Sequence, residues 1–374
     1  LIDTSHSNRF ETEDIRPLIS AIIRSGYRVE FTSFSSDLES KLSKADAFVV
    51  IDPGTDFSEE EARAIKSFVQ DGGRLVMIGE PNRMEVGALT LTTIRNHLTS
   101  LSSEFGIEFG TGYLYNMQTE FRDGNHQNIF SVPKGESSFA QGIDRTVFYT
   151  ATQVEAEGGN TVLVSEEGTQ NSRSNNAQTY GTAVIKGNVM AIGDKTFLKE
   201  GRHNVADNEK LITRIVEFLV TGERDRHLSD YPYIIEENPT VAFTSPELLS
   251  SAQELGNGLQ GEGINPTITL KKQGIRPTNT DILITTFDFM RKSNMSVSGV
   301  EVTTIDNTTR FSVSGVYEAN ATDVGVIRSF DNGFDLVIIV DSPSKASDIV
   351  DILNDGEIDK YVIKRNIAVV EDEI

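Results

Sequence analysis

The sequence predicts an α/β protein: a doubly wound parallel sheet followed by a second, smaller α/β domain. Short continuous apolar runs, such as residues 47–51 and 75–78, alternate with stretches of helical apolar spacing. Such runs are typical of parallel strands that are covered on both faces. The same alternation resumes after a charged segment that contains Pro232. We therefore expect two domains.

The N-terminal part contains the first helix and strand signals. The chain opens with the end of a strand, and residues 3–9 form a polar loop. Apolar residues at helical spacing predict a helix over residues 15–23, which ends at Gly26. Residues 27–32 then alternate as a strand.

The next helix has a clear beginning and end. Ser58 is its expected N-cap, Glu61 completes a capping box, and Phe57 is placed to pack on Ala62. The glycines in the sequence Asp-Gly-Gly at residues 71–73 predict the end of this helix.

The remainder of the first domain is less regular. Residues 110–180 are rich in Gly, Asn, Ser and Gln and predict extended strands and long loops. Strands at 182–186 and 189–192 flank a tight turn at 187–188. A helix over residues 211–219 closes the domain.

We place the first domain at residues 1–224, a linker at 225–237 and the second domain at 238–374. The linker is charged and contains Pro232. In the second domain we expect helices at 246–259 and 344–353, and strands at 241–244, 267–270, 282–286, 300–304, 309–316, 336–340, 361–363 and 367–370.

The chain is strongly acidic. It has 34 basic and 56 acidic residues, which gives a net charge of −22. Such a surface repels nucleic acid and anionic membranes, so we expect neither as a partner. The acidic residues are dispersed, which favours a halophilic protein whose self-repulsion is screened by salt, although an ordinary acidic protein remains an alternative.

Two features bear on location. No run of eighteen apolar residues exists, so we expect contact with a membrane only through an anchor that is not present in this chain. The chain starts at Leu1 within what looks like a strand, which suggests that a signal or anchor segment preceded it. Three sequons favour an extracellular, cell-surface glycoprotein, and the candidate glycosylation sites are Asn294, Asn307 and Asn320.

Polar side chains follow several predicted strands. In a doubly wound sheet, ligands bind beyond the carboxyl ends of the strands, so we expect these side chains to converge there. Each also has a structural interpretation, as a partner for loop amides. The candidate ligand-binding residues are Asp3, His6, Asn8, Asp52, Glu80 and Asp194.

Four segments together resemble one family: residues 3–8 (Asp-Thr-Ser-His-Ser-Asn), 72–80, 187–194 and 204–209. They are similar to an uncharacterised archaeal and bacterial family with a class I glutamine amidotransferase-like domain. That family is usually membrane-anchored and is related to the gliding-motility ABC-transporter auxiliary proteins; a comparable domain occurs in an intraflagellar-transport scaffold protein. The resemblance covers residues 1–224 and implies a flavodoxin- or amidotransferase-like sheet.

The resemblance also implies where a nucleophile would lie. Amidotransferases of this fold carry a cysteine on a sharp turn after a strand, with a histidine and a glutamate as partners. Here the turn Gly79-Glu80-Pro81 takes the comparable place, and the chain contains no cysteine. No Gly-x-Ser-x-Gly motif supplies a serine instead. We therefore expect no catalytic residue and no enzymatic activity.

No cofactor and no metal ion are expected. Without cysteine, disulfides and Cys-ligated metal sites are excluded. The five histidines do not occur at His-Glu-x-x-His spacing, and the oxygen-rich loop at 123–128 does not match an EF-hand. The glycine fingerprints of nucleotide sites are also absent.

Three functions remain open. The leading hypothesis is a non-catalytic extracytoplasmic binding or scaffold module of an anchored surface protein, which binds a protein partner or self-associates. The first alternative is a solute-binding component of an ABC-type transport system. The second is a hydrolase that uses Asp3, His6 and Glu80.

The net charge of −22 predicts that added salt stabilises the fold. The melting temperature should rise between low and molar NaCl, by roughly 2–4 °C for each kcal/mol of repulsion that is screened. Calorimetry over a salt series measures this. A flat or falling melting temperature would contradict the halophilic interpretation.

Overall fold

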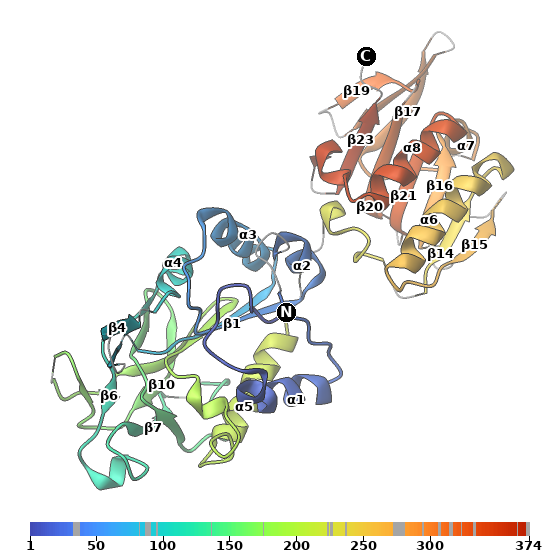
Figure 1. The fold of residues 1–374 in the computed structure, drawn as a ribbon. Coiled ribbons are helices and arrows are strands. Elements are labelled where there is room, and N and C mark those ends of the chain that lie inside the picture. Colours follow the sequence, from blue (N-terminus) through green and yellow to red (C-terminus); the bar gives the residue numbers. More distant parts are fainter. Residues whose placement is uncertain are drawn as a thin grey trace. The chain divides into compact units, whose positions relative to one another are not determined.

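The computed structural model describes the chain except for residues 33–37, 82, 87–90, 95, 136, 175, 223, 225, 226, 236, 237, 272–280, 294, 306, 307, 314–316, 323, 332, 333, 365 and 372–374. It is a mixed α/β protein that divides into two compact units, Leu1–Asp225 and Arg226–Ile374 (Figure 1). Each unit has its own central sheet and its own hydrophobic cores.

A seven-stranded mixed sheet forms the centre of the first unit. β1 (Ala47–Ile51), β2 (Arg74–Ile78) and β13 (Val189–Ile192) are parallel neighbours. Ile2 forms parallel bridges with Val49 and with Phe31, so the N-terminus lies beside β1. Beyond β13 the sheet continues with four antiparallel strands: β12 (Gly181–Lys186), β10 (Asn160–Ser165), β7 (Asn128–Pro133) and β8 (Thr146–Tyr149).

Helices cover both faces of the parallel strands. Successive strand residues point to opposite faces of the sheet, so each face has its own hydrophobic core. Val49 belongs to a core that includes α1 (Arg16–Arg24) and α5 (Asn208–Val220). The next residue, Val50, belongs to a second core, which includes α2 (Leu38–Lys44), α3 (Glu59–Gln70) and α4 (Thr99–Ser102). The two layers of helices are visible in Figure 1.

The expected parallel order holds only for β1, β2 and β13, so the prediction of a parallel sheet is too broad. The connection from β12 to β13 is the tight turn at 187–188, where Gly187 has a φ of 57°. A turn this short joins only antiparallel neighbours, whereas parallel strands need a long crossover. The irregular region 110–180 supplies the other antiparallel strands.

Several local predictions are confirmed in this unit. Ser58 caps α3: its Oγ accepts a hydrogen bond from the Glu61 amide at 3.2 Å, and Glu61 Oε2 accepts one from the Ser58 amide at 2.8 Å. The closing helix is α5. The strand expected at 27–32 is not formed, since only Phe31 makes a bridge there.

Shorter elements complete the first unit around this sheet. The small strands are β3 (Arg83–Val86), β4 (Leu91–Ile94), β5 (Ile107–Phe109), β6 (Leu114–Tyr115), β9 (Val154–Ala156) and β11 (Gln170–Asn171). The short 3-10 helices are η1 (Thr12–Ile15), η3 (Ser103–Phe105), η4 (Thr119–Phe121) and η5 (Thr196–Leu198).

The second unit contains another seven-stranded mixed sheet. Its parallel part is β15 (Thr267–Leu270), β14 (Thr240–Phe243), β16 (Ile282–Thr286) and β21 (Phe334–Val340). Its antiparallel part is β20 (Val324–Asp331), β23 (Ile367–Glu371) and β22 (Val362–Lys364).

Two cores also flank this second sheet. On one face, α6 (Leu249–Gly261) and α8 (Pro343–Asn354) pack on the strands. The other face carries α7 (Phe287–Ser293) and a three-stranded sheet of β17 (Val300–Ile305), β18 (Thr308–Val313) and β19 (Tyr317–Asn320). The predicted antiparallel pairing of the first two of these strands is confirmed.

Part of the segment that we expected as a linker packs into the second unit. Leu228, Tyr231, Ile234 and Ile235 are buried in the core that contains α6 and α8. The short helices of this unit are η6 (Leu228–Asp230), η7 (Pro246–Leu248) and η9 (Ile358–Tyr361). The charged residues of this segment led us to expect a linker, but these apolar side chains belong to the core of the second unit.

Limited trypsin digestion should cut between Gly222 and Leu228, because the division between the units falls within this stretch. Burial of the side chains from Leu228 to Ile235 should protect the chain beyond it. Mass spectrometry of the first two fragments identifies the cut. A first cleavage inside either unit, with this stretch intact, would contradict the boundary.

Candidate functional site

The six candidate ligand-binding residues lie along one edge of the first sheet. Asp3 follows the bridge at Ile2, Asp52 follows β1, Glu80 follows β2, and Asp194 follows β13. Because these strands are parallel, their carboxyl ends share that edge. Whether the six residues bind a ligand stays a prediction.

The N-terminal loop folds around the carboxylate of Asp3, which is fully buried. This carboxylate accepts hydrogen bonds from Ser5 Oγ at 2.8 Å, Thr32 Oγ1 at 2.9 Å and Asn8 Nδ2 at 3.1 Å. His6 Nδ1 lies 3.1 Å from both of its oxygens. Burial alone would raise the pKa of Asp3, but the hydrogen bond and charge of His6, with Ser5 and Asn8, outweigh burial and lower it.

His6 is buried and held on three sides. Its Nδ1 contacts Asp3, its Nε2 lies 3.3 Å from Glu61 Oε1, and its ring stacks on Phe57 at 3.7 Å. Burial would lower the pKa of His6, but the hydrogen bond and charge of Asp3, followed by Glu61, outweigh burial and raise it. Both ring nitrogens are therefore directed at carboxylates, which favour the imidazolium form.

Asp52 forms a second buried cluster. Its Oδ1 lies 2.9 Å from Arg9 Nη2, and its Oδ2 pairs with Lys195 Nζ. Lys195 also donates a hydrogen bond to the backbone oxygen of Arg9. Asp52 has a φ of 38°, a left-handed conformation that is unusual for a residue other than glycine. These pairs tie the N-terminal loop to the ends of β1 and β13.

Glu80 and Asp194 form a third cluster. Asp194 is fully buried, and its oxygens accept hydrogen bonds from the amides of Tyr149 at 2.7 Å and Thr196 at 2.8 Å. Glu80 Oε1 accepts one from the Lys195 amide at 3.3 Å. A hydrogen bond from the Glu80 side chain also lowers the pKa of Asp194, against the larger effect of burial. Burial raises the pKa of Asp194 to about 6.

Among the described contacts, the three clusters divide the predicted residues. Asp3, His6 and Asn8 are brought together, Glu80 joins Asp194, and Asp52 pairs with Arg9 and Lys195. Arg9, Lys195 and Glu61 take part in these clusters although no sequence pattern predicted it. Lys195 directly follows a candidate residue, and Glu61 was recognised only as a helix cap.

The predicted glycosylation sites are partly visible. Asn320 is exposed at the end of β19. Asn294 and Asn307 lie outside the described residues. Glycosylation of all three stays a prediction.

The described part of the chain lacks two features. It contains no group of three or more His, Asp or Glu side chains arranged to hold a metal ion. None of its helices is both long enough and apolar enough to cross a membrane.

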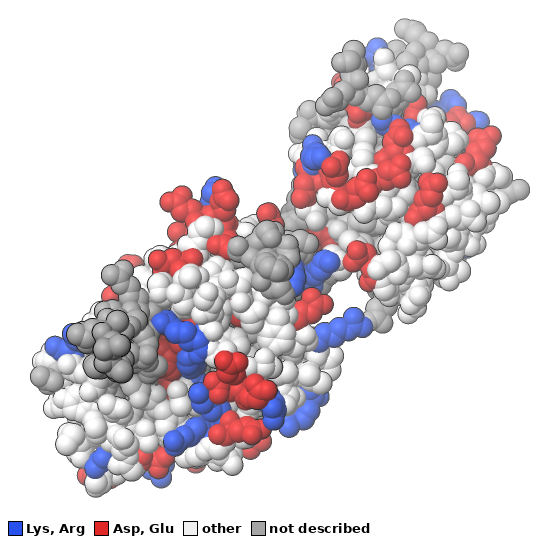
Figure 2. Space-filling model, in the orientation of Figure 1, with Lys and Arg blue, Asp and Glu red and all other residues white. Residues whose placement is uncertain are grey.

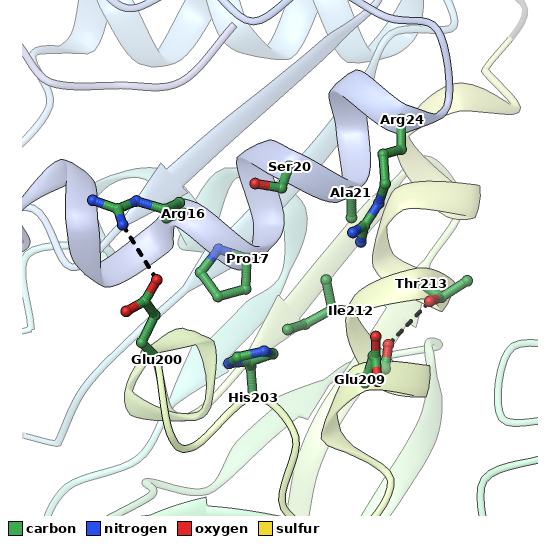
Figure 3. A pocket seen from close by; sticks show the side chains of 10 residues that line it. All are labelled: Arg16, Pro17, Ser20, Ala21, Arg24, Glu200, His203, Glu209, Ile212 and Thr213. Carbon is green, nitrogen blue, oxygen red and sulfur yellow. Dashed lines mark hydrogen bonds and ion pairs between the residues drawn. The ribbon is translucent and has the colours of Figure 1, made fainter.

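A pocket of about 180 Å³ lies elsewhere in the first unit, between α1 and the beginning of α5 (Figure 3). Its wall includes residues from the loop that follows η5, such as Glu200 and His203. None of the six candidate residues lines it. No sequence motif indicated this pocket, because its residues come from two helices and a loop that are far apart in the chain.

The first unit is thus a mixed α/β domain whose buried charges are paired along the carboxyl edge of its parallel strands. Residues 21–216 match the model of a domain of unknown function, DUF4350, and the chain belongs to that family. No curated protein matches the sequence significantly.

Solved structures resemble the chain only distantly. The N-terminal domain of mmIFT52 is 13% identical, with a TM-score of 0.47, over 59% of this chain and 97% of that one. A ThuA-like protein from Bacteroides uniformis is 11% identical, with a TM-score of 0.38, over 59% and 90% of the two chains. A ThuA-like protein from Parabacteroides merdae is 12% identical, with a TM-score of 0.34, over 59% and 88%.

The Glu80–Asp194 pair predicts a specific pH dependence. Folding raises the pKa of Asp194 from 3.8 to about 6. Protonated Asp194 therefore makes its full contribution to the free energy of unfolding below pH 3.8, and this contribution is lost as the pH rises through 6. Asp194→Asn should remove this loss, because an asparagine carries no charge that burial could penalise. Relative to the unmodified protein, the variant should gain up to about 3 kcal/mol between pH 4 and pH 7.5.

Urea denaturation followed by circular dichroism measures this difference at fixed salt. The control is Glu60→Gln on the exposed face of α3, which removes the same charge from the surface. Equal pH profiles for the two variants would show that burial does not raise the pKa of Asp194.

Proposed function

We propose that this chain is a non-catalytic binding or scaffold module of an anchored, extracytoplasmic cell-surface protein. Its partner is a second protein or another copy of the same chain. No nucleic acid and no cofactor take part, and any membrane attachment is through an anchor outside this chain.

The observation that carries this proposal is the position of Glu80. In the resemblance to amidotransferase-like domains, this turn is where a nucleophile would stand. The Glu80 side chain is buried, and it is committed to hydrogen bonds with Asp194 and with the Lys195 amide. A carboxylate at this turn is a poor nucleophile for acyl transfer and repels a developing oxyanion.

The state of His6 also supports a structural role. A general base needs a free nitrogen that faces the substrate, and a third group must orient the ring. Asp3 orients the ring of His6, but Glu61 faces the other nitrogen. The imidazole is therefore part of a buried Asp3–His6–Glu61 ion cluster, which links the N-terminal loop to the first turn of α3.

The surface charge supports a protein partner over nucleic acid. Figure 2 shows acidic side chains spread over the visible face. The exposed acidic residues of the second unit include Glu254 of α6, Asp348 and Asp351 of α8, and Asp355, which follows α8. With a net charge of −22, the chain repels polyanions such as nucleic acid, and salt shortens the range of this repulsion.

The finer parts of the proposal rest on the sequence. They are the relationship to amidotransferase-like and motility-transporter proteins, the halophilic character and the glycosylation of Asn294, Asn307 and Asn320. A hydrolase remains a second candidate, because the Asp3–His6 contact is the arrangement that orients a histidine in hydrolytic triads.

A hydrolase screen separates these two functions. Ester, amide and glycoside substrates at molar NaCl should give no turnover above the buffer rate. The hydroxyl beside His6 is that of Ser5, 3.1 Å from His6 Nδ1, and it donates its proton to Asp3 at 2.8 Å, so His6 does not activate it. His6→Ala and Glu80→Gln should change stability but no reaction rate.

The matched control for the histidine variant is His97→Ala, which removes a surface pair with Asp56. Turnover that disappears in His6→Ala and in Glu80→Gln, and persists in His97→Ala with all folds intact, would overturn the proposal and establish the hydrolase.

A further inference from the structure

The pocket between α1 and α5 has an apolar floor and a charged rim. Pro17 and Ala21 of α1 and Ile212 of α5 supply the apolar surface. Its volume of about 180 Å³ is small, since sites for drug-sized ligands have roughly 300–1,000 Å³. The pocket therefore suits a ligand with only a short apolar part. Figure 3 shows Ile212 at its centre.

Two charged residues on the rim are available to a ligand. Arg24 and Glu209 are exposed, and among the described residues neither side chain forms an ion pair or a hydrogen bond. In Figure 3 Arg24 extends from α1 toward α5, and Glu209 lies on the first turn of α5. By contrast, the other two charges on the rim are already paired, because Arg16 Nη1 lies 3.3 Å from Glu200 Oε1.

The charge balance of the rim selects the class of ligand. Two arginines and two glutamates give no net charge, within a chain of net charge −22. A simple anion would gain from Arg24 but would be repelled by Glu209 and by the chain as a whole. A simple cation would gain from Glu209 but would be repelled by Arg24. A zwitterion matches one free positive group and one free negative group, and the field of the chain does not repel it.

We propose that this pocket binds a free α-amino acid with a small aliphatic side chain. The carboxylate pairs with the guanidinium of Arg24, and the ammonium pairs with Glu209. The side chain packs on Pro17, Ala21 and Ile212. Arginine suits this task, because its planar group donates two parallel hydrogen bonds to a carboxylate. This site goes beyond the proposed scaffold function and does not depend on it.

Titration of the full chain with L-leucine tests the proposal. The readout is the δ1-methyl NMR signal of Ile212 in protein labelled at isoleucine methyl groups, assigned through Ile212→Val. We expect a saturable shift of this signal. N-acetyl-leucine lacks the ammonium and leucine amide lacks the carboxylate, so each should bind at least about tenfold more weakly, the loss of one charged hydrogen bond.

Two variants and one control complete the experiment. Arg24→Met and Glu209→Gln should each weaken leucine binding by about tenfold or more. Arg63→Met removes an exposed arginine of α3, outside the pocket, and should leave binding unchanged. The proposal is overturned if leucine gives no saturable shift up to its solubility limit. It is also overturned if the three compounds bind equally, or if Arg24→Met binds as the unmodified protein does.

Discussion

The buried carboxylate of Asp52 is the constraint on which the arrangement of the first unit depends. A carboxylate with so little access to water is costly unless cations and donors surround it. Arg9 arrives from the N-terminal loop and Lys195 from the end of β13, so one side chain fixes two segments that are remote in sequence. The left-handed backbone at Asp52 is tolerated because these contacts hold it.

The other two clusters extend the same principle along this edge. The imidazole of His6 lies between the carboxylates of Asp3 and Glu61, and Asp194 is surrounded by Glu80 and the amides of Tyr149 and Thr196. In each case a buried charge is compensated by a neighbour from another element. The polar side chains at this edge are therefore used for internal pairing.

Local patterns predicted much of the fold, and long-range contacts explain what was missed. The cap formed by Ser58 and Glu61 and the buried run at β1 depend on neighbouring residues, so the sequence contains the signal. The convergence of Asp52 and Asp194 followed from the parallel order of their strands. The role of Lys195 could not be predicted in this way, because the sequence around a lysine does not show whether its side chain faces solvent or a buried carboxylate. The tight turn at 187–188 indicated one antiparallel pair, β12 with β13, but the order of the other antiparallel strands was missed because strand periodicity does not reveal direction.

The neighbours of β2 have a consequence for biosynthesis. β2 pairs with β1 on one side and with β13 on the other, yet β13 is translated only after the whole irregular region 110–180. Until β13 emerges from the ribosome, the hydrogen-bonding edge of β2 has no native partner. Such long-range pairing slows folding and leaves an open strand edge that attracts other chains. The nascent chain therefore exposes this edge of β2 until β13 has been synthesised.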